Sequence, residues 1–243
     1  VLGVGAQGSA AARKLDREPD VSEIVCADID RTAVDSLVSE LTKATGATVD
    51  AHSKDSIVEA ARGVDLILNG LPLECTKNVL DAALEVKANY QDYAATTSLD
   101  EDWVESIRIQ YDVYGPRFKE IGRLAIVGTG SAPGLICAAT RDAMRYLDTC
   151  DTIYNIVWEG VEAKRFLPFW WSPVTALHDM SEKGYAFENG RLIRLEAYEH
   201  PVSRQHGETA HALTFVDHRH AQTIQHIYKA EKFKKIQKKP DTK

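Results

Sequence analysis

The chain has 243 residues, 44% hydrophobic and 27% charged, so it can bury one large core or two smaller ones. Its net charge of −7 argues against a nucleic-acid or anionic-membrane partner, and no apolar run approaches the roughly 20 residues that span a bilayer. The four cysteines lie far apart and form no C-x-x-C pair, which favours a reducing cytoplasm. We therefore expect a cytoplasmic protein with a small-molecule partner.

The first eight residues form a G-x-G-x-x-G loop between an apolar strand and a helix. The first glycine of such a loop permits a tight turn, the second lets the backbone approach a pyrophosphate, and the third lets the helix pack close to the sheet. The helix N-terminus then favours the anion through its unpaired N–H groups and its dipole. The residues expected to contact a dinucleotide here are Gly3, Gly5, Ala6, Gln7 and Gly8.

An acid follows the loop at the distance expected for dinucleotide binding. The apolar run 24–28 ends on Asp28, whose carboxylate can accept the hydroxyls of the adenosine ribose and repels a 2′-phosphate. This predicts a preference for NAD, although Arg31 could pair with the phosphate and leaves NADP possible. Ile29 and Asp30 belong to the same predicted contact. The alternative is a glycine-rich turn that holds no ligand.

Strand and helix patterns alternate through the first half of the chain. This alternation predicts a doubly wound parallel sheet of the Rossmann type with right-handed crossovers, over residues 1–127. After the first strand and the run 24–28, the expected strands are 47–51, 64–69, 89–94 and 124–127. The expected helices are 10–16, 32–45, 53–62, 77–86 and 101–111.

Ligands in such sheets bind at the carboxyl ends of the strands, which singles out three further stretches. Asp50 and Ala51 are expected at the adenine edge, unless the acid caps the helix after Ser53. Asp92 and Tyr93 are the candidates for polar contact with the reacting centre. For Asp92 the alternative is a structural one, in which it caps a helix near Ser98 or pairs with a backbone amide. The nicotinamide is expected near Asn69, Gly70, Leu71 and Pro72.

The second half changes character. A small-residue loop at 128–134 precedes an apolar helix at 135–147, and the run 185–192 has the Asn-Gly turn of a hairpin. These patterns predict a smaller α+β domain over residues 128–243, whose last helix could return to the first domain.

Three other groups of residues have weaker signals. Lys164 and Arg165 could hold a substrate carboxylate, or form a solvated strand edge. Trp170 and Trp171 could wall a substrate pocket, or pack in a core or dimer interface. Six of the eight histidines lie after residue 199 without metal-ligand spacing, so we expect no metal site, although one could act as an acid–base group.

Several stretches together resemble the saccharopine dehydrogenase family, and within it the lysine 6-dehydrogenase-like branch. They are the glycine loop with Ala27-Asp28, Asn69-Gly70-Leu71-Pro72, Tyr90-Gln91-Asp92-Tyr93-Ala94, Gly130-Ser131-Ala132-Pro133-Gly134-Leu135, Trp171-Ser172-Pro173 and the 188–192 hairpin. The resemblance covers residues 1–202. It implies an NAD- or NADP-binding first domain and a second domain that covers the nicotinamide and mediates dimerisation. Family members usually continue through a longer substrate domain after the position of Val202, so a segment is missing here or the domain is reduced.

The resemblance implies hydride transfer at a C–N bond of an amino acid or opine-like substrate. Arg165 and Trp171 are the candidate substrate contacts. A polyamine-pathway reductase that joins an aldehyde and an amine is one alternative. The other is a dinucleotide-binding protein without turnover, because a fold does not determine a function.

Overall fold

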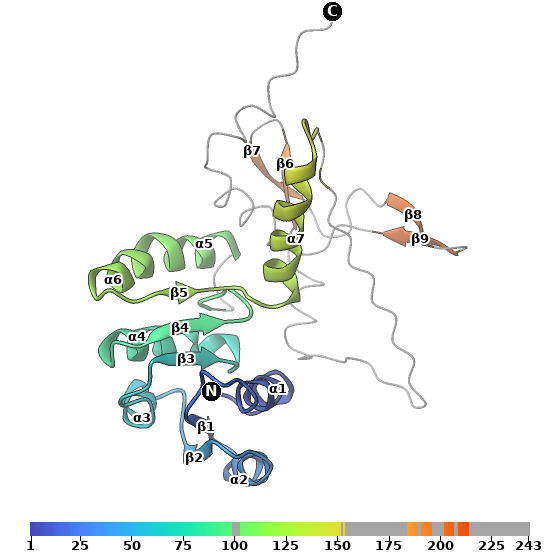
Figure 1. The fold of residues 1–243 in the computed structure, drawn as a ribbon. Helices are drawn as coiled ribbons and strands as arrows, with labels where there is room; N and C mark the ends of the chain where they lie inside the picture. Colours follow the sequence, from blue (N-terminus) through green and yellow to red (C-terminus); the bar gives the residue numbers. More distant parts are fainter. Residues whose placement is uncertain are drawn as a thin grey trace, which may run out of the picture. The chain divides into compact units, whose positions relative to one another are not determined.

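The computed structural model describes residues 1–98, 103–151, 153, 184–188, 191–195, 202–206 and 209–213. The chain divides into two compact units, Val1–Leu135 and Ile136–Lys243 (Figure 1). The predicted domain organisation, with its boundary after residue 127, stays a prediction.

The first unit is built on parallel strands. Leu2 forms parallel bridges to Ala27 and to Asn69, so the N-terminal segment lies between two strands that it joins into one sheet. The spatial order is therefore β2, β1, the N-terminal segment, β3, β4 and β5, which confirms the predicted doubly wound sheet (Figure 1). The strands are β1 Ile24–Asp28, β2 Ala44–Thr48, β3 Leu66–Asn69, β4 Asn89–Asp92 and β5 Ala125–Ile126.

Helices cover the sheet and bury two apolar clusters. Because side chains alternate across a strand, Ile24 and Cys26 of β1 pack with Ala12, Val34 and Leu37 in one cluster. Ala27 contributes to the other, larger cluster, which includes Ile57, Leu80, Tyr90 and Phe118. The helices are α1 Ala6–Leu15, α2 Arg31–Ser39, α3 Lys54–Ala60, α4 Thr76–Glu85 after the 3₁₀ turn η1 Leu73–Cys75, α5 Trp103–Arg108 and α6 Gly115–Glu120.

The second predicted helix and the strand after it are placed differently in the structure. The helix ends at Ser39 instead of continuing to Thr45, and β2 occupies 44–48 instead of 47–51. The carboxylate of Asp16 accepts the backbone amides of Thr42 and Lys43 at 2.9 and 2.8 Å. This contact comes from a distant turn of the chain, so the local helical pattern contains no sign of it.

The helix predicted at 101–111 differs in the opposite way, because the helical run continues beyond residue 111. A π-helical stretch, η2 Ile109–Tyr114, joins α5 to α6, and the helical run continues to Glu120. Gly115 and Pro116 lie in the first turn of α6. Proline is tolerated in the first turn of a helix, where its missing N–H needs no intrahelical partner.

The second unit is described in five segments and one single residue, 153. Helix α7 spans Ile136–Ala143 and continues as the 3₁₀ turn η4 Met144–Tyr146, after the short π-type turn η3 Ser131–Leu135 of the first unit. The expected hairpin is confirmed, because β6 Gly184–Glu188 pairs antiparallel with β7 Arg191–Leu195. A second antiparallel pair, β8 Val202–His206 with β9 Thr209–Leu213, was not predicted.

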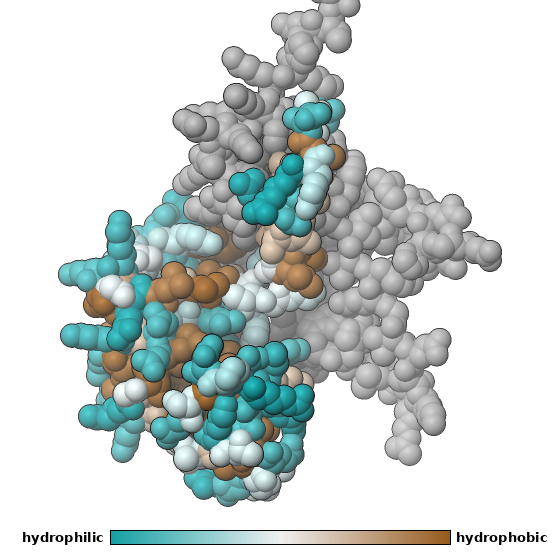
Figure 2. All heavy atoms as spheres, viewed as in Figure 1, coloured by the Kyte–Doolittle hydropathy of each residue, from teal (hydrophilic) through white to brown (hydrophobic). Residues whose placement is uncertain are grey.

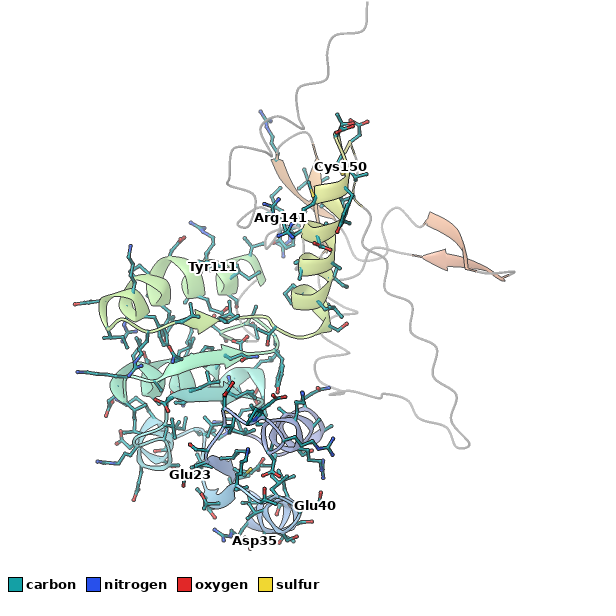
Figure 3. The ribbon with its side chains drawn as sticks, viewed as in Figure 1. Glu23, Asp35, Glu40, Tyr111, Arg141 and Cys150 are labelled. Atoms are coloured by element: carbon teal, nitrogen blue, oxygen red, sulfur yellow. The ribbon has the colours of Figure 1, made fainter. Side chains whose placement is uncertain are left out.

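Exposed charged side chains form ion pairs on the surface of the first unit. Arg13 pairs with Glu40, and Arg31 with Asp35. Figure 3 labels the two acids of these pairs. Apolar side chains gather near β5 in the view of Figure 2, where Leu124 and Ile126 are 59% and 49% exposed. Within the described ranges, no helix is both long and apolar enough to cross a membrane.

Candidate cofactor site

Two glycines of the first loop are required by close backbone packing. Gly3 has a φ of +82°, and a Cβ there would lie 2.8 Å from the carbonyl carbon of Gly70. A Cβ on Gly8 would overlap the carbonyl oxygen of Gly3. The roles predicted for these glycines, a tight turn and a close helix–sheet contact, therefore agree with the geometry.

Gly5 differs from these two glycines because the space beside it is open. A Cβ on Gly5 would meet nothing within 4 Å, and the residue stands at the N-cap of α1 with no side-chain cap. Gly5, Ala6 and Gln7 are exposed, and the first turn of the helix contains no acid. The loop thus leaves N–H groups and free space where a pyrophosphate would lie, so the residues fit a dinucleotide.

The carboxylate of Asp28 lies directly beside this loop. Its Oδ2 accepts the backbone amide of Val4 at 2.8 Å, and its Oδ1 accepts the amide of Asp30 at 3.1 Å. Each oxygen keeps a further lone pair for a ribose hydroxyl. The acid is thereby oriented at the end of β1, next to the place that the glycine loop offers to the pyrophosphate.

The residues after Asp28 are placed as follows. Ile29 is 68% exposed and available to a ligand. The side chain of Asp30 caps α2 by accepting the amides of Thr32 and Ala33. The guanidinium of Arg31 pairs with Asp35 at 2.8 Å, one helical turn away. The predicted contacts of these three residues with a cofactor stay predictions.

Asp50 and Ala51 follow β2. Asp50 is exposed, and its Oδ1 accepts the amide of His52 at 3.0 Å. Ser53 supplies the side-chain cap of α3, so capping of that helix does not account for the acid. The carbonyl of Ala51 accepts a hydrogen bond from Asn78 at 3.0 Å. The adenine contact stays a prediction.

The carboxyl ends of β3 and β4 line a pocket of about 80 Å³ together with the glycine loop. It brings together Gln7, the Asn69–Leu71 turn and the pair Asp92–Tyr93, three predicted stretches that are distant in sequence. Pro72 does not line it and instead precedes η1. The lining residues are Gln7, Asn69, Gly70, Leu71, Leu73, Thr76, Asp92, Tyr93, Ala94 and Thr96.

Asp92 is buried, with 4% exposure, and its carboxylate is held by three donors. Oδ1 accepts the amides of Ala95 at 3.1 Å and Gly128 at 2.6 Å, while Oδ2 accepts the hydroxyl of Tyr90 at 2.9 Å. These contacts match the structural alternative in which Asp92 pairs with backbone amides. A direct catalytic role stays a prediction.

The hydrogen bonds of Asp92 continue through Tyr90 to the next strand. Tyr90 accepts Nδ2 of Asn69 at 3.0 Å, and Oδ1 of Asn69 accepts the amide of Leu71 at 3.1 Å. Burial raises the pKa of Tyr90 well above 10.0, and the nearby charge of Asp92 raises it further. Burial also raises the pKa of Asp92, although the donors around its carboxylate oppose that shift.

Tyr93 contributes a phenol side chain to the lining of the pocket. Its side chain lies near Gly70, where a Cβ would be 3.5 Å from Cε2 of the ring. Among the described residues its hydroxyl forms no hydrogen bond, and burial raises its pKa above 10.0, so the phenol is neutral near pH 7. The hydroxyl can therefore donate to a ligand or accept from one.

Some pocket residues were not predicted from the sequence. They are Leu73, Thr76, Ala94 and Thr96. Thr96 follows the predicted strand end at residue 94 by two residues, so the rule that ligands bind after strand ends could have included it. Thr76 sits at the start of α4, beyond a turn whose path the sequence does not specify.

Other predicted residues lie outside the described residues. These include both substrate-binding predictions, Arg165 and Trp171. Of the histidines after residue 199, only His206 and His211 are described, in β8 and β9. In the described part of the chain, no cluster of His, Cys, Asp and Glu side chains could hold a metal ion.

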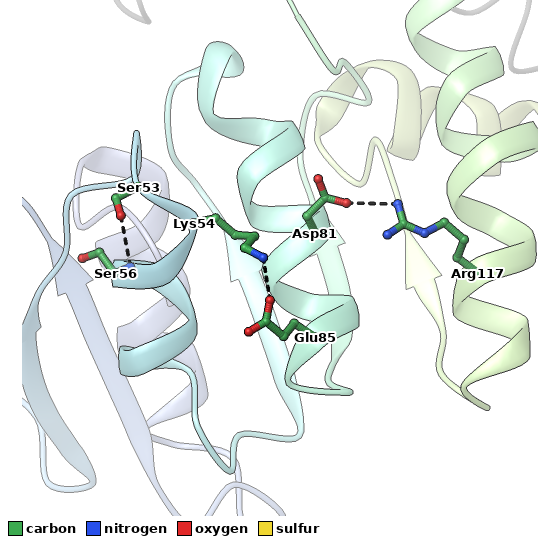
Figure 4. Close-up of polar contacts among 6 residues, drawn as sticks. All are labelled: Ser53, Lys54, Ser56, Asp81, Glu85 and Arg117. Atoms are coloured by element: carbon green, nitrogen blue, oxygen red, sulfur yellow. Dashed lines mark hydrogen bonds and ion pairs between the residues drawn. The ribbon is translucent and has the colours of Figure 1, made fainter.

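A second, larger hollow of about 440 Å³ lies on the helical surface, lined by Lys54, Asp81, Leu84, Glu85 and Arg117. Lys54 pairs with Glu85 at 2.6 Å and Arg117 with Asp81 at 3.0 Å (Figure 4). Both cations are thus already neutralised by carboxylates, and neither the glycine loop nor Asp92 contributes to it. The smaller pocket is therefore the candidate site.

The sheet order, the open glycine loop and the pocket define an NAD(P)-binding domain of the Rossmann type. Residues 1–126 match the family model described as the saccharopine dehydrogenase NADP-binding domain. The chain therefore belongs to the saccharopine dehydrogenase family. Membership of the lysine 6-dehydrogenase-like branch stays a prediction.

Two comparisons with individual proteins cover more of the chain than residues 1–126. A carboxyaminopropylagmatine dehydrogenase from Synechocystis sp. is 25% identical over 203 residues, which cover 78% of this chain and 48% of that protein. A saccharopine dehydrogenase (L-Glu forming) from Saccharomyces cerevisiae has a similar structure, with a TM-score of 0.58 and 13% identity over 86% of this chain and 47% of that one. The second likeness supports the fold alone. The chain spans about half the length of each protein.

Proposed function

We propose that this protein is an NAD(P)-dependent oxidoreductase that acts at a C–N bond of an amino acid or opine-like substrate. The observation that carries the proposal is the pocket that joins Gln7 of the glycine loop to Tyr93, with family membership behind it. A bound nicotinamide would supply the hydride acceptor or donor. The protein itself then has to bind the cofactor and the substrate, orient them and exchange a proton with the substrate.

In this proposal the dinucleotide crosses the carboxyl edge of the sheet. Asp28 holds the adenosine ribose, the N-terminus of α1 holds the pyrophosphate, and the nicotinamide half reaches the Asn69–Leu71 turn. Tyr93 then lies at the reacting centre, where its neutral hydroxyl can donate a hydrogen bond or a proton to the substrate. Asp92 acts behind it as a positioning residue.

NAD is the proposed cofactor, with NADP as the alternative. The carboxylate of Asp28 favours a ribose diol and repels a 2′-phosphate. The family model is described as an NADP-binding domain. The proposed preference for NAD therefore depends on two features of this chain, the carboxylate of Asp28 and the pairing of Arg31 with Asp35. We also propose a homodimer, which the family resemblance implies.

A second candidate is favoured by the relative from Synechocystis sp., whose alignment extends well beyond the first domain. In that case the enzyme joins an aldehyde to an amine that bears a guanidino group and reduces the product with NAD(P)H. Both candidates use the same cofactor pocket and differ in the substrate.

Nicotinamide absorbance decides between these functions. The protein is screened with L-amino acids and NAD or NADP, and separately with an amino-acid semialdehyde, a guanidino amine and NADH or NADPH. Turnover in the first assay supports the amino-acid dehydrogenase, and turnover in the second supports the reductase. Tight cofactor binding without turnover in either assay would contradict both and favour a binding protein without catalysis.

A further inference from the structure

A buried chain of three side chains runs behind the pocket. Asn69, Tyr90 and Asp92 are exposed by only 4%, 1% and 4%, and they lie on neighbouring strands β3 and β4. Their hydrogen bonds are 3.0 Å from Asn69 to Tyr90 and 2.9 Å from Tyr90 to Asp92. Tyr90 was not singled out by the sequence, and it does not line the pocket itself.

The direction of these hydrogen bonds follows from their ends. Oδ1 of Asn69 accepts the amide of Leu71, so its Nδ2 has to donate to Tyr90. The oxygen of Tyr90 is then an acceptor, and its own proton is donated to Oδ2 of Asp92. The carboxylate therefore sets the orientation of the Asn69 amide through Tyr90.

The far end of this chain is the turn that lines the pocket. Oδ1 of Asn69 accepts the amide of Leu71, and Gly70 and Leu71 line the pocket together with Tyr93. The adenosine ribose would bind elsewhere, at Asp28 of β1, which the N-terminal segment separates from β3. A substitution in these three buried side chains should therefore alter binding of the nicotinamide half of the dinucleotide and leave binding of the adenosine half unchanged.

We propose that Tyr90 is a positioning residue that holds the Gly70–Leu71 turn in the shape that receives the nicotinamide half of the cofactor. This inference rests on the proposed function. The phenol acts through Asn69 and is held in place by Asp92, and it touches neither cofactor nor substrate. Its loss should weaken contacts with the nicotinamide half and leave the adenosine and pyrophosphate contacts unchanged.

The test compares two ligands on the same protein preparations. NADH carries both halves of the cofactor, whereas ADP-ribose lacks the nicotinamide. Tyr90→Phe keeps the ring beside Phe118, whose centroid is 6.3 Å away, and removes the hydroxyl. We expect NADH affinity to fall about 3- to 10-fold, as for one lost hydrogen bond, and ADP-ribose affinity to stay within about twofold. Tyr146→Phe, at a residue 81% exposed, is the matched control and should change neither.

Asp92→Asn provides an independent variant, since it removes the acceptor that orients Tyr90. It should also weaken NADH binding without weakening ADP-ribose binding. The double variant with both substitutions should lose no more NADH affinity than the weaker-binding single variant, because both substitutions interrupt the same series of hydrogen bonds. Equal losses for the two ligands, or unchanged NADH affinity in Tyr90→Phe, would overturn the inference. Wild-type protein that binds neither ligand would instead overturn the proposed function.

Discussion

The backbone of Gly3 approaches Gly70 so closely that a Cβ on Gly3 would lie 2.8 Å from the carbonyl carbon of Gly70. The amide of Gly70 also donates to the carbonyl of Leu2 at 2.8 Å. The first glycine loop and the turn after β3 are thus fixed to each other by backbone contacts. This relationship fixes the glycine loop, where we propose that the pyrophosphate binds, beside the turn that lines the pocket.

Gly3→Ala should destabilise the fold through this contact. The substitution combines a positive φ of +82° with an overlap against backbone that cannot move aside. Gly63→Ala is the matched control, because Gly63 has a φ of +79° and nothing within 4 Å of a Cβ. We expect the control to cost about 1 kcal/mol of unfolding free energy and Gly3→Ala to cost about 2 kcal/mol more. Equal losses in urea denaturation would show that the approach to Gly70 carries no strain.

Asp28 should determine the choice of cofactor. Wild-type protein is expected to bind NADH more tightly than NADPH, because the carboxylate repels the 2′-phosphate. Asp28→Asn should reduce that preference by removing the charge. Isothermal titration with both cofactors measures it. Tighter binding of NADPH to the wild type would contradict the prediction and indicate that Arg31 leaves Asp35 for the phosphate.

Asp92→Asn should lower stability, because Tyr90 loses its acceptor and the two backbone amides lose a charged one. We expect a loss of about 1.5–3 kcal/mol, whereas Asp65→Asn at an exposed residue should change little. Turnover measured on the same preparation separates this role from direct catalysis. A fall of about 10²-fold or more at unchanged melting temperature would instead identify Asp92 as an acid–base group.

The pH dependence of that stability loss has a definite sign. Burial raises the folded-state pKa of Asp92 above 3.8, so the folded protein binds this proton more tightly than the unfolded chain does. The stability that Asp92 contributes is therefore complete below 3.8 and declines as pH rises through the folded-state pKa. The asparagine variant lacks this decline, so its deficit relative to wild type should narrow as pH rises. A gap that widens would contradict the pKa direction.

Tyr93→Phe should affect chemistry more than binding. The variant keeps the ring that packs near Gly70 and removes the hydroxyl that lacks a partner in the described residues. Turnover should fall by about 10²-fold, with the dissociation constant of the cofactor within about twofold of wild type. Steady-state rates combined with cofactor titration check both values. Normal turnover would remove Tyr93 from the reacting centre.

The sequence predicts well what depends on local pattern. The glycine spacing, the acid at Asp28 and the alternation of strands and helices follow from residues close together in the chain, and the structure confirms the resulting sheet. The predictions are wrong where a contact between residues distant in sequence determines the local structure. One example is the carboxylate of Asp16, which accepts the amides of Thr42 and Lys43 beyond the early end of the second helix. The role that we propose for Tyr90 could not be predicted either, because it depends on a hydrogen bond from Asn69 on another strand. From the sequence alone, a tyrosine in a buried strand is interpreted as core packing.

The central claim is that the open N-terminus of α1 at Gly5 binds the pyrophosphate of a dinucleotide. Calorimetric titration of NADH and NADPH into wild type, Gly5→Val and the control Ala10→Val tests it most directly. A valine at Gly5 fills space that is empty in the fold, so the variant should unfold like wild type and lose cofactor binding, while Ala10→Val should bind normally. Unchanged cofactor affinity in a folded Gly5→Val protein would contradict the account.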